Sequence, residues 1–84
     1  MRGLTIFNMD DTMIIYNRKL EAKDFNALDE REELIYYKNN NIAYTINKIV
    51  DNNNYIIREK KIFNNQLVNE QLCKTIAQIE KKVL

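Results

Sequence analysis

Residues 34–63 read LIYYKNNNIAYTINKIVDNNNYIIREKKIF, and this stretch predicts most of the fold. Three runs rich in Ile, Tyr, Val and Thr are separated by Asn39–Asn41 and by residues 51–54. Short β-prone runs joined by three or four turn formers are typical of hairpins. We therefore predict a three-strand antiparallel meander over about residues 34–63.

The register of this meander can be tested for internal consistency. A turn centred on Asn40 pairs Leu34 with Ile46 and Tyr36 with Tyr44. A second turn centred on Asn52 and Asn53 would pair Lys48 with Ile57. One face then collects these apolar residues together with Ile42, Val50, Tyr55 and Phe63. The opposite face collects Ala43, Thr45, Asn47, Arg58 and Lys60, with Ile35, Ile49, Ile56 and Ile62 as exceptions. A one-residue slip would invert the separation, which supports the register.

Apolar residues recur at helical spacing near the end of the chain. Val68, Leu72, Ile76, Ile79 and Val83 follow one another at intervals of three or four residues. Asn64 or Asn65 is a suitable N-cap, and Lys81 and Lys82 suit the last turn of a helix. We predict one helix over residues 65–83. A stripe of four of its residues is the candidate partner-binding face: Leu72, Ile76, Ile79 and Val83.

The region before the meander is less regular. Leu4–Asn8 and Met13–Asn17 form a plausible first hairpin. Residues 18–33 are compatible with a strand followed by a loop, which we prefer, or with a helix, because Phe25, Leu28 and Ile35 fall near helical spacing. The expected fold is a single α+β domain over residues 1–84, with its strands within residues 3–63. An antiparallel meander or small open barrel of about five strands would precede the helix.

Composition restricts the class of protein. The chain has 84 residues, a net charge of +1, no His, one Cys and one Gly. It lacks a run of about 20 apolar residues that would span a bilayer, a secretory signal and an internal disulfide, so we expect a cytoplasmic protein with no membrane partner. Asn occurs 13 times and Ile 12 times. This bias indicates an AT-rich genome, such as that of a low-GC bacterium or its phage.

One short motif offers chemistry. Phe7-Asn8-Met9-Asp10-Asp11-Thr12 resembles the first motif of haloacid-dehalogenase-type phosphatases, in which the first Asp is the nucleophile and a second Asp is the general acid and base. The position of the nucleophile is held here by Asn8, whose amide is not nucleophilic. The resemblance implies a degenerate phosphatase fragment. The alternative is a turn rich in Asp and Thr, which we prefer.

The remaining residues give little support for catalysis, so we expect a protein that is not an enzyme and that binds no cofactor or metal. The hypothesis that we prefer is a protein-interaction module, a homo-oligomer, encoded by a phage or mobile element to modulate or inhibit a host protein. The alternative is a small nucleic-acid-binding domain, because basic residues gather on the last predicted hairpin. Its candidate contacts are Lys48, Arg58 and Lys60.

Overall fold

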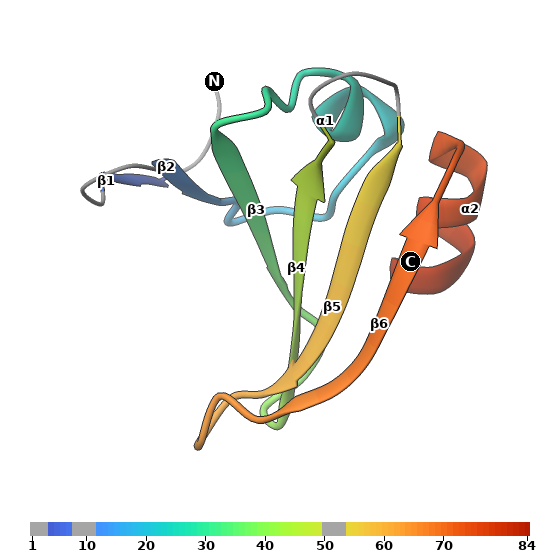
Figure 1. Ribbon diagram of the computed structural model, residues 1–84. Helices are drawn as coiled ribbons and strands as arrows, with labels where there is room; N and C mark the ends of the chain where they lie inside the picture. The colour runs from blue at the N-terminus through green and yellow to red at the C-terminus, as the bar shows by residue number, and fades with distance from the viewer. Residues whose placement is uncertain (1–3, 8–11, 50–53) are drawn as a thin grey trace.

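The computed structural model describes residues 4–7, 12–49 and 54–84, which form one open sheet with two helices on one of its faces (Figure 1). Six strands follow the order of the chain across the sheet. They are β1 (Leu4–Phe7), β2 (Thr12–Ile15), β3 (Glu32–Tyr37), β4 (Ile42–Lys48), β5 (Tyr55–Lys61) and β6 (Leu67–Cys73). The helices are α1 (Ala22–Asn26) and α2 (Ile76–Val83). The expected α+β class, a meander followed by a C-terminal helix, is confirmed.

The meander forms because its turns and its alternating side chains specify the same register. Leu34 pairs with Ile46 and Tyr36 with Tyr44, as predicted. The Asn39 side chain caps the first turn by accepting hydrogen bonds from the backbone N–H groups of Asn41 and Ile42. Such local bonds explain why Asn is favoured in turns. The first hairpin is therefore fixed by local chemistry.

The predicted register of the second hairpin is wrong by two residues. Lys48 pairs with Tyr55 and Ile46 with Ile57. The N–H of Ile49 donates to the carbonyl of Asn54 at 2.9 Å, so the connection comprises residues 50–53. A shift of two residues preserves the face on which each side chain lies. Val50, expected on the apolar face, falls outside the described residues.

The segment between β2 and β3 crosses over the sheet, because these two strands are parallel. Parallel neighbours require a long crossover, and α1 lies within it. The preferred strand over residues 19–25 is therefore wrong, and the helical alternative is the correct one. A reciprocal capping box between Glu21 and Asp24 starts the helix, and Phe25 and Leu28 become buried.

The largest correction concerns the predicted helix over residues 65–83, whose first half is the strand β6. Asn65 does not cap a helix. It adopts a positive φ of 57° in the turn that joins β5 to β6, a conformation that Asn tolerates better than most residues. The helix α2 starts only after Thr75, whose Oγ1 accepts a hydrogen bond from the N–H of Gln78 at 3.2 Å. Lys81 and Lys82 occupy its last turn, as expected.

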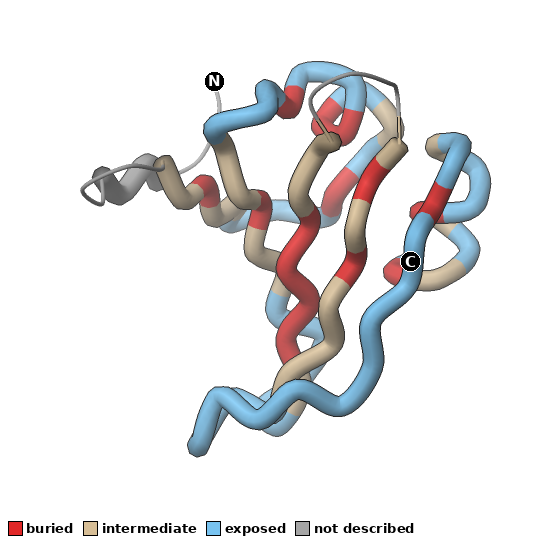
Figure 2. The backbone as a smooth tube through the Cα atoms, viewed as in Figure 1, coloured by how far each residue is buried: buried red, intermediate tan, exposed pale blue. Residues whose placement is uncertain are grey.

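The hydrophobic core lies between the helices and one face of the sheet, which we call the covered face. Phe25 from α1 and Ile79 and Val83 from α2 pack with apolar residues from β2–β6. The strand residues of this core are Ile14, Leu34, Tyr44, Ile46, Tyr55, Ile57 and Cys73. Burial falls off sharply toward β6, which is exposed over most of its length (Figure 2). In the described part of the chain no helix lies on the opposite face of the sheet, which we call the uncovered face.

Candidate functional site

The four residues predicted to form a partner-binding stripe do not lie on one exposed helical face. Leu72 is in β6 and is 48% exposed, whereas Ile79 is fully buried and Val83 nearly so. Ile76 is partly buried and packs against the core. The stripe interpretation is therefore wrong in its geometry, because α2 uses these residues to cover the sheet. Only Leu72 remains available to a partner.

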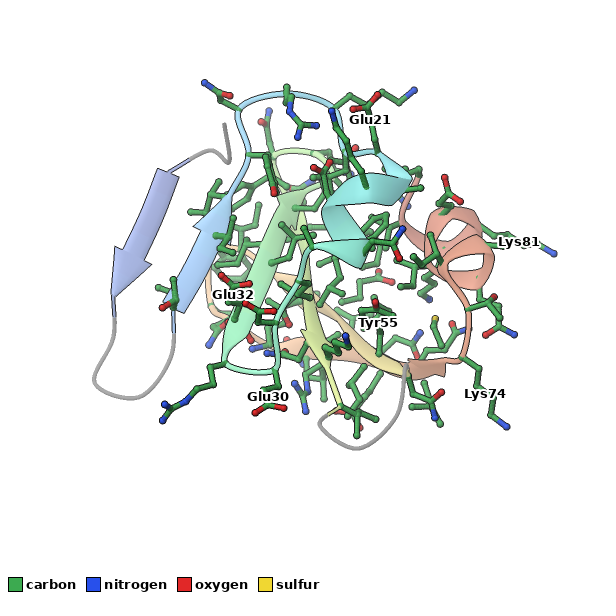
Figure 3. All side chains as sticks on the ribbon, turned by 90° about the horizontal axis from the view of Figure 1, so that it is seen from above. Glu21, Glu30, Glu32, Tyr55, Lys74 and Lys81 are labelled. Atoms are coloured by element: carbon green, nitrogen blue, oxygen red, sulfur yellow. The ribbon has the colours of Figure 1, made fainter. Side chains whose placement is uncertain are left out.

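The three basic residues predicted to contact nucleic acid are not brought together. Lys48 pairs with Tyr55, a residue of the covered face, whereas Arg58 and Lys60 alternate along the opposite face. Lys48 instead lines a groove of about 510 Å³ with the acidic loop before β3. Asp29 and Glu30 from that loop, Glu32 at the start of β3 and Arg31 also line the groove, and Figure 3 labels Glu30 and Glu32 at this end of the sheet, so Lys48 shares it with three carboxylates and one guanidinium.

Arg58 already has two protein partners. Its Nε donates to Oε2 of Glu70 at 2.7 Å, and its Nη1 donates to Oδ1 of Asn47 at 3.3 Å. The ion pair joins β5 to β6 across the uncovered face and neutralises the charge of both residues. A phosphate would have to compete with Glu70 for this guanidinium. The geometry therefore weakens the basis for nucleic-acid contact.

The Asn8–Asp11 part of the phosphatase-like motif lies outside the described residues. Its flanking strands are described, and Phe7 pairs with Thr12 in an antiparallel hairpin. The predicted first hairpin is thereby confirmed. The resemblance implies a parallel Rossmann-like sheet, and this topology differs from it. Among the residues that the structure describes, no group of three or more His, Cys, Asp or Glu is placed to hold a metal ion.

A strong ion pair lies at the start of the crossover. The guanidinium of Arg18 forms two hydrogen bonds with the carboxylate of Asp24, at 2.6 and 2.9 Å, and stacks over Tyr16 at 4.6 Å from the ring centroid. Burial alone would raise the pKa of Asp24. Hydrogen bonds from Arg18 and from the N–H of Glu21 outweigh it and lower this pKa. The contacts hold the carboxylate charged at the N-terminus of α1, which indicates a structural role.

Two further titratable groups are buried in the core. The hydroxyl of Tyr55 donates to the carbonyl of Phe25 at 3.1 Å, and Figure 3 places this side chain between the sheet and the helices. Burial raises the pKa of Tyr55 and that of the Cys73 thiol. A thiol with a raised pKa is a poor nucleophile, as expected for a structural cysteine. Both groups therefore contribute to packing.

The most unusual surface feature is a run of exposed apolar side chains. Of the seven large hydrophobic residues that are exposed in the described part of the chain, five lie between residues 62 and 72. We call them the 62–72 surface: Ile62, Phe63, Leu67, Val68 and Leu72. Phe63, expected on the apolar face of the meander, is 86% exposed in the turn before β6. Single exposed apolar residues are ordinary, but five within eleven consecutive positions on one turn and one edge strand make this segment the candidate interaction site.

Sequence reasoning missed this surface because it assigned Leu67, Val68 and Leu72 to a helix and Ile62 and Phe63 to the last strand of the meander. The signals were present: Asn64 and Asn65 form a turn pair like those of the meander, and Thr75 with Gln78 matches the S/T-x-x-E/Q capping box. The side chain of Gln78 accepts a hydrogen bond from the N–H of Lys74 at 2.6 Å. Together these signals place a hairpin before residue 74 and a helix after it.

The fold and this surface define a small α+β domain with an apolar edge. No family model matches the chain, and comparisons with curated proteins and with solved structures also returned no match. No helix in the described ranges is long and apolar enough to cross a membrane. The geometry of the 62–72 surface is therefore the basis for assigning a function.

Proposed function

We propose that the chain is a non-enzymatic protein-interaction module. The observation that supports this most is the 62–72 surface, which places five large apolar side chains on a single turn and edge strand. Each of these residues is more than a third exposed in a domain that otherwise buries its apolar groups well. Such a patch is unfavourable in water unless a partner covers it.

The surroundings of the patch favour a protein partner over nucleic acid. Phe63 is the one aromatic member of this surface, and the other four, Ile62, Leu67, Val68 and Leu72, are aliphatic and offer no stacking surface for bases. The nearest guanidinium, that of Arg58, is bound to Glu70. Lys60 and Lys61 flank the turn and suit a partner with acidic groups around an apolar pocket.

In this proposal the module works in a reducing cytoplasm, where Cys73 stays a buried thiol, and it forms homo-oligomers. One role that fits so small a domain is modulation or inhibition of a host protein by a phage- or mobile-element-encoded partner. The domain contributes a rigid hairpin, and the turn containing Phe63 presents the most exposed side chain.

Photocrosslinking tests this proposal. A photoreactive phenylalanine analogue replaces Phe63 in the full chain, which is then irradiated in cells of the source organism and compared with the same analogue at Leu84. Leu84 is 46% exposed but lies after α2 and outside the 62–72 surface. We expect a defined protein adduct from position 63 that position 84 does not give, and that Leu67→Lys removes. Identical adducts from both positions, or none from position 63, would contradict the proposal.

A further inference from the structure

The strand β6 ends the sheet and pairs with no further strand on its outer side in the described part of the chain. Six of its seven residues are exposed, and only Cys73 is buried (Figure 2). An edge strand carries a row of backbone donors and acceptors that can pair with another strand. The outer side of β6 is therefore open to strand addition.

Natural edge strands usually carry features that prevent such pairing, and β6 has few of them. It contains no Pro, Lys or Arg, and its only charged residue is Glu70. That charge is held by Arg58 of the neighbouring strand at 2.7 Å. A bulge at Val68, opposite Glu59 and Lys60, disturbs the ladder to β5 near the start of the strand. The stretch from Asn69 to Cys73 stays regular.

The sequence of β6 is chemically palindromic about Glu70. Moving outward from Glu70, the residues on the two sides are the amides Asn69 and Gln71, and then the apolar residues Val68 and Leu72. An antiparallel pair of identical strands related by a two-fold axis normal to the sheet must be centred on one residue. Centring the pair on Glu70 places Val68 opposite Leu72 of the other copy, so that apolar side chains face each other. It also places Asn69 opposite Gln71, so that amides face each other.

We propose that a second copy of this chain binds along β6, with its own β6 antiparallel and the two-fold axis at Glu70, so that the two sheets become one. Alternative centres are poorer. An axis at Asn69 would place Glu70 opposite Val68 of the other copy, and an axis at Gln71 would place it opposite Leu72. Both arrangements set a carboxylate against an aliphatic side chain.

The two Glu70 residues that meet at the axis are compatible with this arrangement because each has its own Arg58. The cluster of two carboxylates and two guanidiniums has no net charge, and each guanidinium is also anchored by Asn47 at 3.3 Å. The axis places the two α2 helices on the same side of the joined sheet. On that side of β6, Gln71, Gln78, Lys81 and Lys82 line a groove of about 420 Å³ in the single chain. The inference deepens the proposed function, on which it rests, by naming one partner.

A charge-swap experiment tests both the pairing and its register. In the proposed dimer, Val68 of one copy lies opposite Leu72 of the other. We expect Val68→Lys and Leu72→Glu each to weaken dimerisation at least about tenfold, because each buries a charge opposite an aliphatic side chain. An equimolar mixture should restore dimers, since one contact becomes Lys opposite Glu and the other keeps its natural residues. Sedimentation equilibrium of the full chain measures the dissociation constants.

Controls separate pairing from unfolding. Leu84→Lys changes an equally exposed apolar residue away from β6 and should leave the dissociation constant unchanged. Circular dichroism establishes that every variant is folded. A wild-type chain that stays monomeric up to its solubility limit would overturn the inference. So would folded single variants that dimerise normally, or a mixture that fails to recover. A monomer that still gives a specific adduct at position 63 would overturn this pairing and the homo-oligomer, and would leave the proposed protein-interaction function standing.

Discussion

The strand β6 and the helix α2 are neighbours in the chain, yet their apolar residues differ in how far they are buried. In α2, Ile79 and Val83 are buried against the sheet. In β6, Leu67, Val68 and Leu72 are each about half exposed. The same residue types thus contribute to the core in one element and to the surface in the other.

The difference indicates that the apolar residues of α2 mainly stabilise the fold, whereas those of β6 mainly serve association. Burial of a large aliphatic side chain contributes about 1.5–3 kcal/mol to folding, and α2 supplies such residues to the covered face. The half-exposed residues of β6 contribute less to the folded monomer and retain apolar area that a partner can bury. Substitutions that affect only stability or only association test this difference between α2 and β6.

Matched truncations in the two elements should give the largest contrast. Ile79→Ala should lower the free energy of unfolding by about 3 kcal/mol, because it leaves a cavity in the core. Leu72→Ala should change it by about 0.5 kcal/mol or less, since its side chain already lies half in water. Urea denaturation at low protein concentration measures both values without a contribution from dimerisation. Equal effects would mean that β6 is as much a part of the core as α2.

The ion pair at the start of α1 tests how the crossover is held onto the covered face. Asp24→Ala should destabilise the fold by about 2 kcal/mol, because it removes the helix cap and the charged partner of Arg18. Folding lowers the pKa of Asp24. Its stabilising contribution should therefore be present above about pH 4, the ordinary range of an aspartate, and be lost as pH falls through the lower folded pKa.

Urea denaturation across acidic pH measures this effect. Lys23→Ala is the matched control, because it removes the exposed pair between Lys23 and Glu21, whose charged atoms lie 3.3 Å apart, and only the smallest of the influences that lower the pKa of Asp24. That variant should keep nearly the wild-type stability and pH profile. A profile for Asp24→Ala that parallels the wild type throughout the acidic range would show that Asp24 does not couple protonation to folding.

The first hairpin of the meander was predictable because local and long-range signals agree. The three Asn residues at 39–41 place the turn, and the register that this turn sets pairs Leu34 with Ile46 and Tyr36 with Tyr44 on one apolar face. The second hairpin lacks such agreement, since residues 51–54 permit more than one turn. Its register was predicted two residues away from the one observed.

The misassignment of β6 has a physical cause in the spacing of its residues. Val68 and Leu72 are four positions apart, which places them on one face of a helix and also on one face of a strand. Periodicity therefore could not distinguish the two, and pairing with β5 over residues 55–60 decided for the strand. The candidate stripe failed for the same reason. Local signals at Thr75 and Gln78 would have moved the start of the helix.

A substitution on the uncovered face should have the smallest effect on the free energy of unfolding, and it tests selectively how this face is packed. Thr45 is 7% exposed between Ile35 and Arg58, and its Oγ1 has no hydrogen-bond partner among the described residues. Thr45→Val keeps the shape and removes the unsatisfied hydroxyl, so the free energy of unfolding should rise by about 1 kcal/mol.

The same substitution at Thr75 provides a control of opposite sign. The hydroxyl of Thr75 caps α2, so Thr75→Val should lower the free energy of unfolding by about 1 kcal/mol. Thermal and urea denaturation of both variants measure the pair. A loss of stability in Thr45→Val would mean that its hydroxyl is solvated or bonded in solution. The uncovered face would then be wetter than its burial implies, and less ready to pack against a partner.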